Sequence, residues 1–170
     1  MRKLTMTAVF TLLAASAAAQ VVEDKVSVGP WDIATAFRGN TFVHCEMRRT
    51  SDGLGITFLR AEDGLALLLD STKWKLERGK TYVVKLSAGG AGIEGKAEAA
   101  SKGVAISLPD RTFNARLRSA DSLDVKGEGA TLTIPLDGSM MAMERLEACY
   151  TKNEKSSADI NPFVAPNRKP

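Results

Sequence analysis

Histidine is almost absent from this sequence, since His44 is the only one among 170 residues. A metal site built on several histidines is therefore excluded, and a Ser-His-Asp triad would have to use His44. No serine lies in the Gly-x-Ser-x-Gly pattern that marks a hydrolase nucleophile. The sequence thus predicts no catalytic residue and no metal site, and it favours His44 as a surface residue.

Neither sign of charge dominates, because 23 basic residues face 20 acidic ones and the formal net charge is only +3. Two of the basic residues, Arg2 and Lys3, belong to an N-terminal segment that we expect to be removed. The remaining chain is close to neutral, with no electrostatic footprint for nucleic acid and no polybasic patch for a membrane surface. The glycines around position 90 match no phosphate-binding fingerprint, so no cofactor is predicted.

Long apolar runs are also missing, apart from residues 4–15 near the N-terminus. This run follows Arg2 and Lys3 and precedes three alanines at 17–19, which is the pattern of a bacterial signal peptide spanning residues 1–19. It is too short to anchor the chain across a bilayer, and no cysteine follows it to carry a lipid. We therefore expect cleavage after about Ala19 and a periplasmic or secreted protein that does not span the membrane.

Cysteine is scarce as well, because the chain has only Cys45 and Cys149. An oxidising compartment outside the cytoplasm favours a bond between them, and the alternative is a pair of buried free thiols. The bond would join one of the first structured elements to the last. We predict this disulfide and expect its role to be architectural.

Short runs of alternating apolar and polar residues, separated by glycine, proline and aspartate turns, fill most of the chain. Residues 20–150 are predicted to form one domain, a mainly antiparallel β-sandwich or curled barrel of about nine or ten strands with a C-terminal helix packed on it. Residues 21–28 could add an edge strand, and Pro135 suits another edge because proline lacks a backbone donor. Residues 151–170 are predicted to be a disordered tail.

Alternation also predicts which side chains face the core. In residues 42–49 it directs one set inward (Val43, Cys45 and Met47) and the other outward (Phe42, His44 and Glu46). Residues 65–69 are apolar on both faces, which predicts that the terminal helix covers their outer face. Residues 73–77 are predicted as a strand with Trp74 inward, and residues 89–92 as a loose hairpin tip. The small inward residues of 93–99 imply a bulky neighbour such as a tryptophan.

Two segments are candidate helices. Residues 110–120 fit a short helix capped by Thr112 or a strand, and we favour the helix. The terminal helix should begin near Asp137 or Ser139 and bury one face, formed by Ala142, Met143, Leu146, Cys149 and Tyr150. Met140 and Met141 lie outside that face, where they would either cover the sheet edge or form a soft contact surface; we favour packing.

Charged side chains supply the candidate contact and reaction sites. The densest basic groups indicate either solvated faces or a patch for an acidic partner, and they comprise Arg48, Arg49, Arg60, Arg111, Arg116 and Arg118. Paired carboxylates could support a glycosidase-like mechanism, and the candidates are Glu62 with Asp63 and Asp121 with Asp124. All four lie at turns or helix ends, where acidic residues commonly form turns and caps.

Several short motifs resemble the invasion-associated locus B family of small exported alphaproteobacterial proteins. They are Gly-Pro-Trp-Asp-Ile at 29–33, Cys45, the run 65–69 followed by Trp74, and Ile-Pro-Leu-Asp-Gly-Ser at 134–139 with Ala142, Leu146 and Cys149. The resemblance implies a β-rich exported protein, and it implies no catalytic residue.

The leading functional prediction is a non-enzymatic exported module that acts through contacts with an unknown protein or cell-envelope component, in host or envelope interaction. The second is a small inhibitor of a secreted or host hydrolase, using a loop at residues 48–53 or 89–92. The third is a carboxylate-dependent enzyme acting on envelope glycans.

Overall fold

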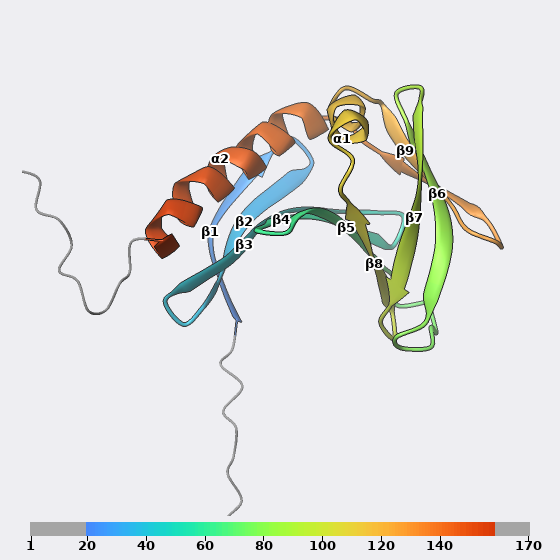
Figure 1. Ribbon diagram of the computed structural model, residues 1–170, viewed down its shortest axis with the longest axis horizontal. Helices are drawn as coiled ribbons and strands as arrows, with labels where there is room; N and C mark the ends of the chain where they lie inside the picture. The colour runs from blue at the N-terminus through green and yellow to red at the C-terminus, as the bar shows by residue number, and fades with distance from the viewer. Residues whose placement is uncertain (1–19, 159–170) are drawn as a thin grey trace, which may run out of the picture.

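The computed structural model describes residues 20–158, so the predicted signal peptide and residues 159–170 lie outside the described range. Ten strands and two helices occupy this range (Figure 1). The strands are β1 (Gln20–Val28), β2 (Trp31–Arg38), β3 (Thr41–Ser51), β4 (Leu54–Ala61), β5 (Gly64–Asp70), β6 (Thr81–Ala88), β7 (Ala91–Ala99), β8 (Gly103–Leu108), β9 (Ser122–Lys126) and β10 (Thr131–Pro135). The helices are α1 (Arg111–Arg118) and α2 (Ser139–Ala158).

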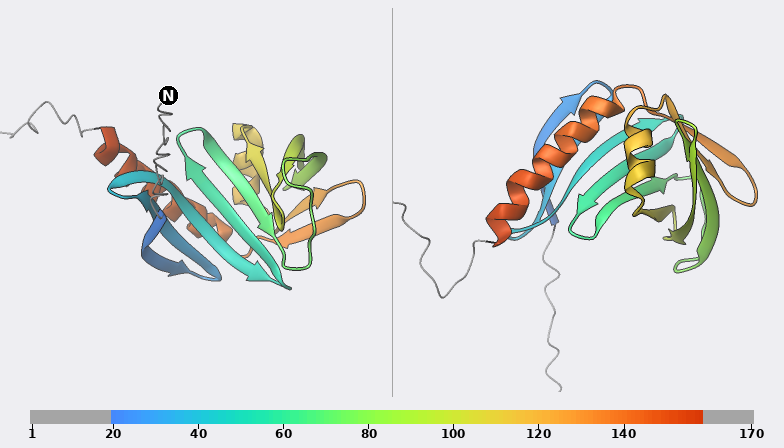
Figure 2. Two further views of the ribbon diagram at one scale, coloured as in Figure 1. Left: turned by 90° about the horizontal axis from the view of Figure 1, so that it is seen from below. Right: turned by 45° about the horizontal axis from the view of Figure 1, so that its top comes forward.

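All ten strands form one sheet in the order β1-β2-β3-β4-β5-β8-β7-β6-β9-β10, and every neighbouring pair is antiparallel. The sheet curls strongly without closing, so that β6 and β7 stand steeply against β3 and β4 (Figures 1 and 2). The predicted mainly antiparallel β fold with a C-terminal helix is therefore confirmed. Both predicted edge strands are confirmed as well, because β1 and β10 end the sheet.

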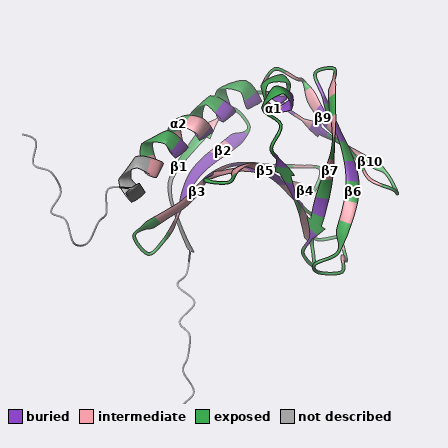
Figure 3. Cartoon of the chain, viewed as in Figure 1, coloured by how far each residue is buried: buried purple, intermediate pink, exposed green. Residues whose placement is uncertain are grey.

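Both helices cover the concave side of the sheet (Figure 2). Helix α2 packs along β2, β3 and β4, whereas α1 contacts β6, β7 and α2. Figure 3 shows buried residues on the strands beneath α2 and on the helix faces turned toward the sheet. The largest fully buried side chains form this core: Trp31, Met47, Ile56, Phe58, Leu67, Leu69, Leu86, Ile106, Leu108, Phe113, Leu117 and Leu123.

A β-bulge in β3 changes the faces predicted for its first residues. His44 pairs with Ala36 and Phe42 pairs with Phe37, which leaves Val43 as an extra residue in the ladder. Because a bulge shifts the alternation by one position, Phe42 lies on the helix side, with its ring centroid 5.8 Å from that of Tyr150. The predicted outward orientation of Phe42 is therefore wrong. The predictions for Cys45 and Met47, both fully buried, are confirmed.

The outer face of β5 is not covered by α2, contrary to the prediction. Leu67 and Leu69 are buried on the concave side, whereas Ala66 and Leu68, on the other face, are only partly buried. Helix α2 instead lies on the concave side, over the strands that carry Trp31 and Cys45. The doubly apolar run thus indicated a partly exposed surface rather than a second packed layer.

Residues 71–80 form turns instead of the strand predicted at 73–77. Single hydrogen bonds hold this segment, such as Leu76 N to Ser101 O at 3.1 Å and Gly79 N to Ala99 O at 2.7 Å. Trp74 nevertheless packs against the core and is partly buried. The predicted inward orientation of Trp74 is therefore confirmed, whereas the strand predicted from its alternation with two lysines is wrong.

Close packing explains the small inward residues of β7, although no tryptophan causes it. A Cβ at Gly95 would lie 3.2 Å from Leu86 Cδ1 and 3.6 Å from Ile106 Cγ2. These leucine and isoleucine side chains come from β6 and β8, the two strands that flank β7. The bulky neighbours are thus cross-strand residues of the same sheet.

The ambiguous segment at 110–120 contains a helix, α1, as favoured. Its N-cap is Asp110, whose Oδ1 accepts a hydrogen bond from Phe113 N at 2.8 Å, so the predicted cap at Thr112 is wrong. Phe113 and Leu117 are the buried residues of the helix. Because α1 is short, its position depends on this cap and on two apolar side chains.

Replacing the cap tests how much it stabilises α1. We expect Asp110→Ala to lower the free energy of unfolding by about 1 kcal/mol, since the Phe113 N–H would lose its acceptor. Thr112→Ala is the matched control, because Thr112 is exposed and should change stability far less. Denaturant unfolding monitored by circular dichroism measures both, and an equal loss in the two variants would contradict the assigned cap.

Helix α2 is longer than predicted, and it begins at Ser139, within the predicted range. It continues to Ala158, so its last turns occupy the start of the predicted tail. Neither predicted N-cap serves as one, because the Asp137 carboxylate pairs with Arg49 and the buried Ser139 hydroxyl has no hydrogen-bond partner among the described residues. The predicted buried face is confirmed, with Cys149 partly buried at its margin.

The two methionines at the start of α2 are exposed. Met140 and Met141 retain 52% and 59% of their accessible surface, so the packing that we favoured for them is wrong. Met143, one turn further along, is buried as predicted.

Candidate functional site

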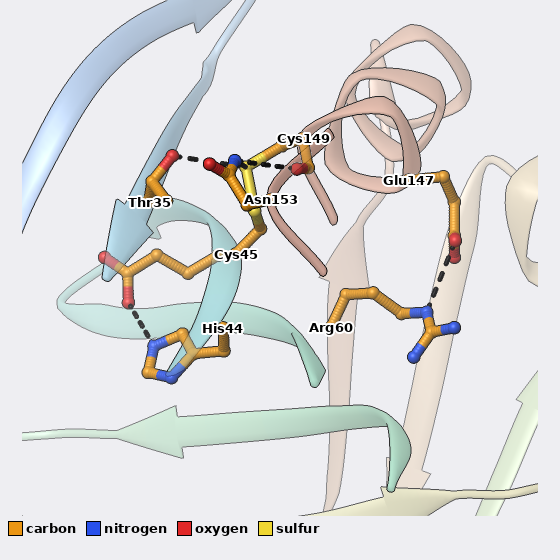
Figure 4. Close-up of a disulfide and its surroundings, with 8 residues drawn as sticks. Thr35, His44, Cys45, Arg60, Glu147, Cys149 and Asn153 are labelled. Carbon is orange, nitrogen blue, oxygen red and sulfur yellow. Dashed lines mark hydrogen bonds and ion pairs between the residues drawn. A yellow bond between two sulfur atoms is a disulfide. The ribbon is translucent and has the colours of Figure 1, made fainter. Parts of the chain in front are cut away.

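Cys45 and Cys149 form a disulfide, as predicted, between residues separated by 104 positions. The bond joins β3 to α2 (Figure 4). Cys45 is fully buried and Cys149 is partly buried, with Thr35 Oγ1 3.3 Å from its sulfur. The bond lies between the sheet and the helix, where it holds α2 on β3 covalently.

His44 lies on the face of β3 opposite the disulfide, where it pairs with Glu46. Its Nε2 is 3.7 Å from Glu46 Oε2, and each of the two side chains is about 15% exposed (Figure 4). The interaction with His44 lowers the pKa of Glu46 below its ordinary value, outweighing the partial burial that would raise it. Among residues 20–158, no group of three potential metal-binding side chains occurs.

Three of the six predicted contact arginines meet at one cavity, and the other three do not. The cavity has a volume of about 570 Å³ and lies between α1, α2 and the turn that joins β4 to β5. We call it the interhelical pocket. Its charged lining residues are Arg60, Glu62, Asp63, Arg111, Arg118 and Glu147, and its apolar ones are Leu65, Leu108, Pro109, Ala115, Met143 and Leu146, with Asn114 and Gly64 completing the wall.

The remaining arginines are dispersed. Arg48 is 62% exposed, and the register of β3 directs it to the face opposite the disulfide. Arg49 is largely buried, with its guanidinium carbon 5.2 Å from the Trp31 ring centroid and an ion pair to Asp137. Arg116 is exposed on α1, beside the turn between β6 and β7. Arg49 is thus a structural residue, and the six arginines do not form a single patch.

Glu147 of α2 connects the pocket arginines. Its Oε2 lies 3.3 Å from Arg60 Nε, and its Oε1 lies 3.5 Å from Arg118 Nη2. Figure 4 shows Arg60 reaching from β4 toward this carboxylate. Arg60 is also held by the backbone oxygen of Ala61 and by the Tyr150 ring, whose centroid is 4.0 Å from its guanidinium carbon. One carboxylate therefore ties α2 to both β4 and α1.

The rest of the rim carries charges without close partners. Within residues 25–154, Arg111, Glu62 and Asp63 make no ion pair. Asn114 Nδ2 donates to Leu108 O at 2.9 Å, which holds α1 on the end of β8, while its Oδ1 is buried without a described partner. The pocket thus combines a basic wall at α1 with an acidic turn at residues 62–63.

The two candidate acid–base pairs lie in different parts of the fold. Glu62 and Asp63 occupy the β4–β5 turn at the pocket rim. Asp124 lies on β9, where its Oδ1 accepts a hydrogen bond from Thr133 at 2.7 Å, and Asp121 O accepts one from Leu136 N. Asp121 and Asp124 therefore stabilise the junction of β9 with β10 rather than contributing to the interhelical pocket.

The two loops proposed for an inhibitor are tight turns. Asp52 and Gly53 have φ values of 51° and 77°, and Gly89 and Gly90 have values of 53° and 76°, which fit two-residue hairpin turns. The prediction of a loose tip at 89–92 is therefore wrong. A Cβ at Gly89 would lie 3.1 Å from Arg116 O, so this turn packs against α1. Neither turn supplies a long protruding loop.

Glu147 is the site residue that sequence reasoning missed. Helical periodicity places it with Glu144 and Arg145, on the face of the helix opposite the predicted buried one. A local signal existed, because Glu147 lies four residues after Met143 and next to Leu146, at the border of the buried face. A carboxylate at such a border commonly pairs with a neighbouring element.

Neither helix within residues 20–158 has the length and apolar character that a bilayer crossing requires. No family model, no curated protein and no solved structure matches this chain.

Proposed function

We propose that the protein is a non-enzymatic exported binding module that holds a charged group of a protein or cell-envelope partner in the interhelical pocket. The observation that carries this proposal is the convergence of Arg60 of β4 with Arg111 and Arg118 of α1 on one cavity of about 570 Å³. Cavities of a few hundred cubic ångströms with a few convergent polar groups are the usual form of a ligand site.

The arginines of the pocket have hydrogen-bonding capacity to spare. A guanidinium carries five N–H donors, and only one nitrogen of Arg118 contacts Glu147. Arg111 makes no ion pair within the described part of the chain. An anionic group that enters the pocket would therefore find donors that no protein acceptor occupies.

Export is the second part of the proposal, and two observations support it. The N-terminal sequence has the pattern of a bacterial signal peptide, and the disulfide is of the kind that persists outside the cytoplasm. The resemblance to the invasion-associated locus B family favours the same compartment and a role in host or envelope contact. The inhibitor alternative gains no support from the two tight turns.

Affinity capture from a periplasmic extract tests the proposed site. Arg111→Ala/Arg118→Ala should reduce partner recovery at least about tenfold, because two charge-assisted contacts are removed. Arg48→Ala is the matched control, since Arg48 is exposed but lies outside the pocket. Recovered proteins and envelope components would be quantified by mass spectrometry at rising salt. Equal recovery with all three proteins would refute the site.

A further inference from the structure

We propose that the interhelical pocket takes the free C-terminal residue of a peptide, and that Glu147 is the internal carboxylate that this ligand displaces from Arg60 and Arg118. The inference rests on the proposed function, whose site it shares, and adds the class of ligand and a built-in competitor.

The argument begins with Glu147, whose carboxylate already occupies a carboxylate-binding position. Each of its oxygens meets one guanidinium, at 3.3 Å from Arg60 and 3.5 Å from Arg118. These contacts are longer than the 2.7–2.9 Å typical of charge-assisted N–H···O bonds, and neither is a bidentate pair. The backbone of α2 fixes where Glu147 can reach, whereas a ligand carboxylate can orient freely between the two guanidinium groups. The geometry therefore favours replacement of the Glu147 carboxylate by a ligand carboxylate.

The charge of the lining favours a monoanion over a phosphate. Three arginines line the pocket, and three carboxylates line it too, namely Glu62, Asp63 and Glu147. Their formal charges cancel, so a dianionic phosphate would meet nearby like charges that oppose it. A carboxylate brings a single charge, and its planar shape matches the guanidinium fork.

The remaining lining favours a peptide over a fatty acid. The apolar wall is small, because Leu108, Leu146 and Met143 are almost fully buried and the accessible apolar surface comes from the partly exposed Leu65 and from the exposed Pro109 and Ala115. This wall suits one amino-acid side chain rather than an acyl chain. The acidic turn also requires donors, which peptide N–H groups supply and a fatty acid lacks. A C-terminal residue with a small apolar side chain suits all three kinds of lining: its carboxylate can bind the arginines, its side chain the apolar residues and its N–H the acidic turn.

Glu147 then sets the affinity of the pocket. A ligand must compete with a tethered carboxylate, so the observed binding is weaker than the arginines alone would give. Neutralising Glu147 should strengthen binding of a carboxylate ligand, whereas removal of a purely structural ion pair would leave binding unchanged or weaken it. This opposite sign separates the competitor role from a structural one.

The test is a titration of the disulfide-intact protein, followed by two-dimensional NMR of backbone and arginine side-chain N–H groups. The probe is N-acetyl-L-alanine, and N-acetyl-L-alaninamide is its matched control without the carboxylate. We expect shifts at Arg60 and Arg118 with the acid only. Glu147→Gln should tighten binding about two- to fivefold, which corresponds to the worth of a partly exposed ion pair. Arg118→Gln should weaken binding about tenfold, and Arg48→Gln should leave it unchanged.

Other outcomes would overturn the inference. Equal binding of the amide would show that no carboxylate is recognised. Weaker binding by a correctly folded Glu147→Gln protein would show that Glu147 does not compete with the ligand. Octanoate or inorganic phosphate binding more tightly than N-acetyl-L-alanine would identify a lipid or phosphate site instead. If no probe binds while partner capture still depends on Arg111 and Arg118, the ligand class is wrong and the site stands. If both experiments fail, the proposed function fails as well.

Discussion

Reduction of the Cys45–Cys149 disulfide is expected to lower the free energy of unfolding by about 4–5 kcal/mol. The bond closes a loop between residues separated by 104 positions, and cross-linking a loop of that size removes a large conformational entropy from the unfolded chain. Stabilities of small domains are commonly 5–15 kcal/mol in total, so the reduced protein should be close to its unfolding threshold. Denaturant unfolding with and without a thiol reductant measures the difference.

The double variant Cys45→Ala/Cys149→Ala controls for the side chains themselves. Its unfolding midpoint should lie near that of the reduced protein and should not respond to reductant. A loss below about 1 kcal/mol on reduction would contradict the expectation, because it would mean that the packing of α2 on β2, β3 and β4 holds the helix without the bond.

Trp31→Ala should produce the second large loss, about 3–5 kcal/mol, as is typical for removal of a large buried aromatic side chain. Trp31 is fully buried, and its ring centroid lies 5.9 Å from that of Phe58. Its Nε1 donates to Asp137 O at 2.9 Å, and Arg49 stacks over its ring. The residue thus joins β2 to the turn that begins α2, and its removal leaves both a cavity and an unsatisfied acceptor.

Trp74→Ala is the matched comparison for Trp31→Ala, because Trp74 is only partly buried and lies in the irregular segment 71–80. We expect it to cost clearly less stability than Trp31→Ala. Thermal and denaturant unfolding of the two variants gives the ranking. A larger loss for Trp74→Ala would show that segment 71–80, rather than the β2–α2 junction, closes the core.

Local patterns were enough to predict most of the strands. Alternation with a period of two and turn residues such as Asp52-Gly53 and Asp63-Gly64 are properties of a few neighbouring residues, and they survive in the folded chain. The bulge at Val43 was not predictable in this way, because it depends on how β3 pairs with β2. The same holds for residues 71–80, where Trp74 and two lysines resemble an alternating strand, but the hydrogen bonds to residues 99–102 are isolated and form no ladder.

The interhelical pocket depends on connections that the sequence does not display. Strand β8 pairs on one side with β7, which precedes it in the sequence, and on the other side with β5, which does not. This crossover brings α1, which follows β8, beside the β4–β5 turn. Only then can Arg60 and Arg118 approach the same carboxylate. The six arginines could be picked out from the sequence, but their separation into pocket, core and outer surface follows from the sheet order.

The open ends of the sheet have a consequence for behaviour at high concentration. An unpaired edge invites another strand to add to it, which can seed aggregation. Strand β10 is short and ends at Pro135, which has no N–H to donate, and β1 is interrupted by a shift in register between Glu23 and Val26. Each edge therefore presents an incomplete template, which disfavours continuous end-to-end stacking of sheets into fibres.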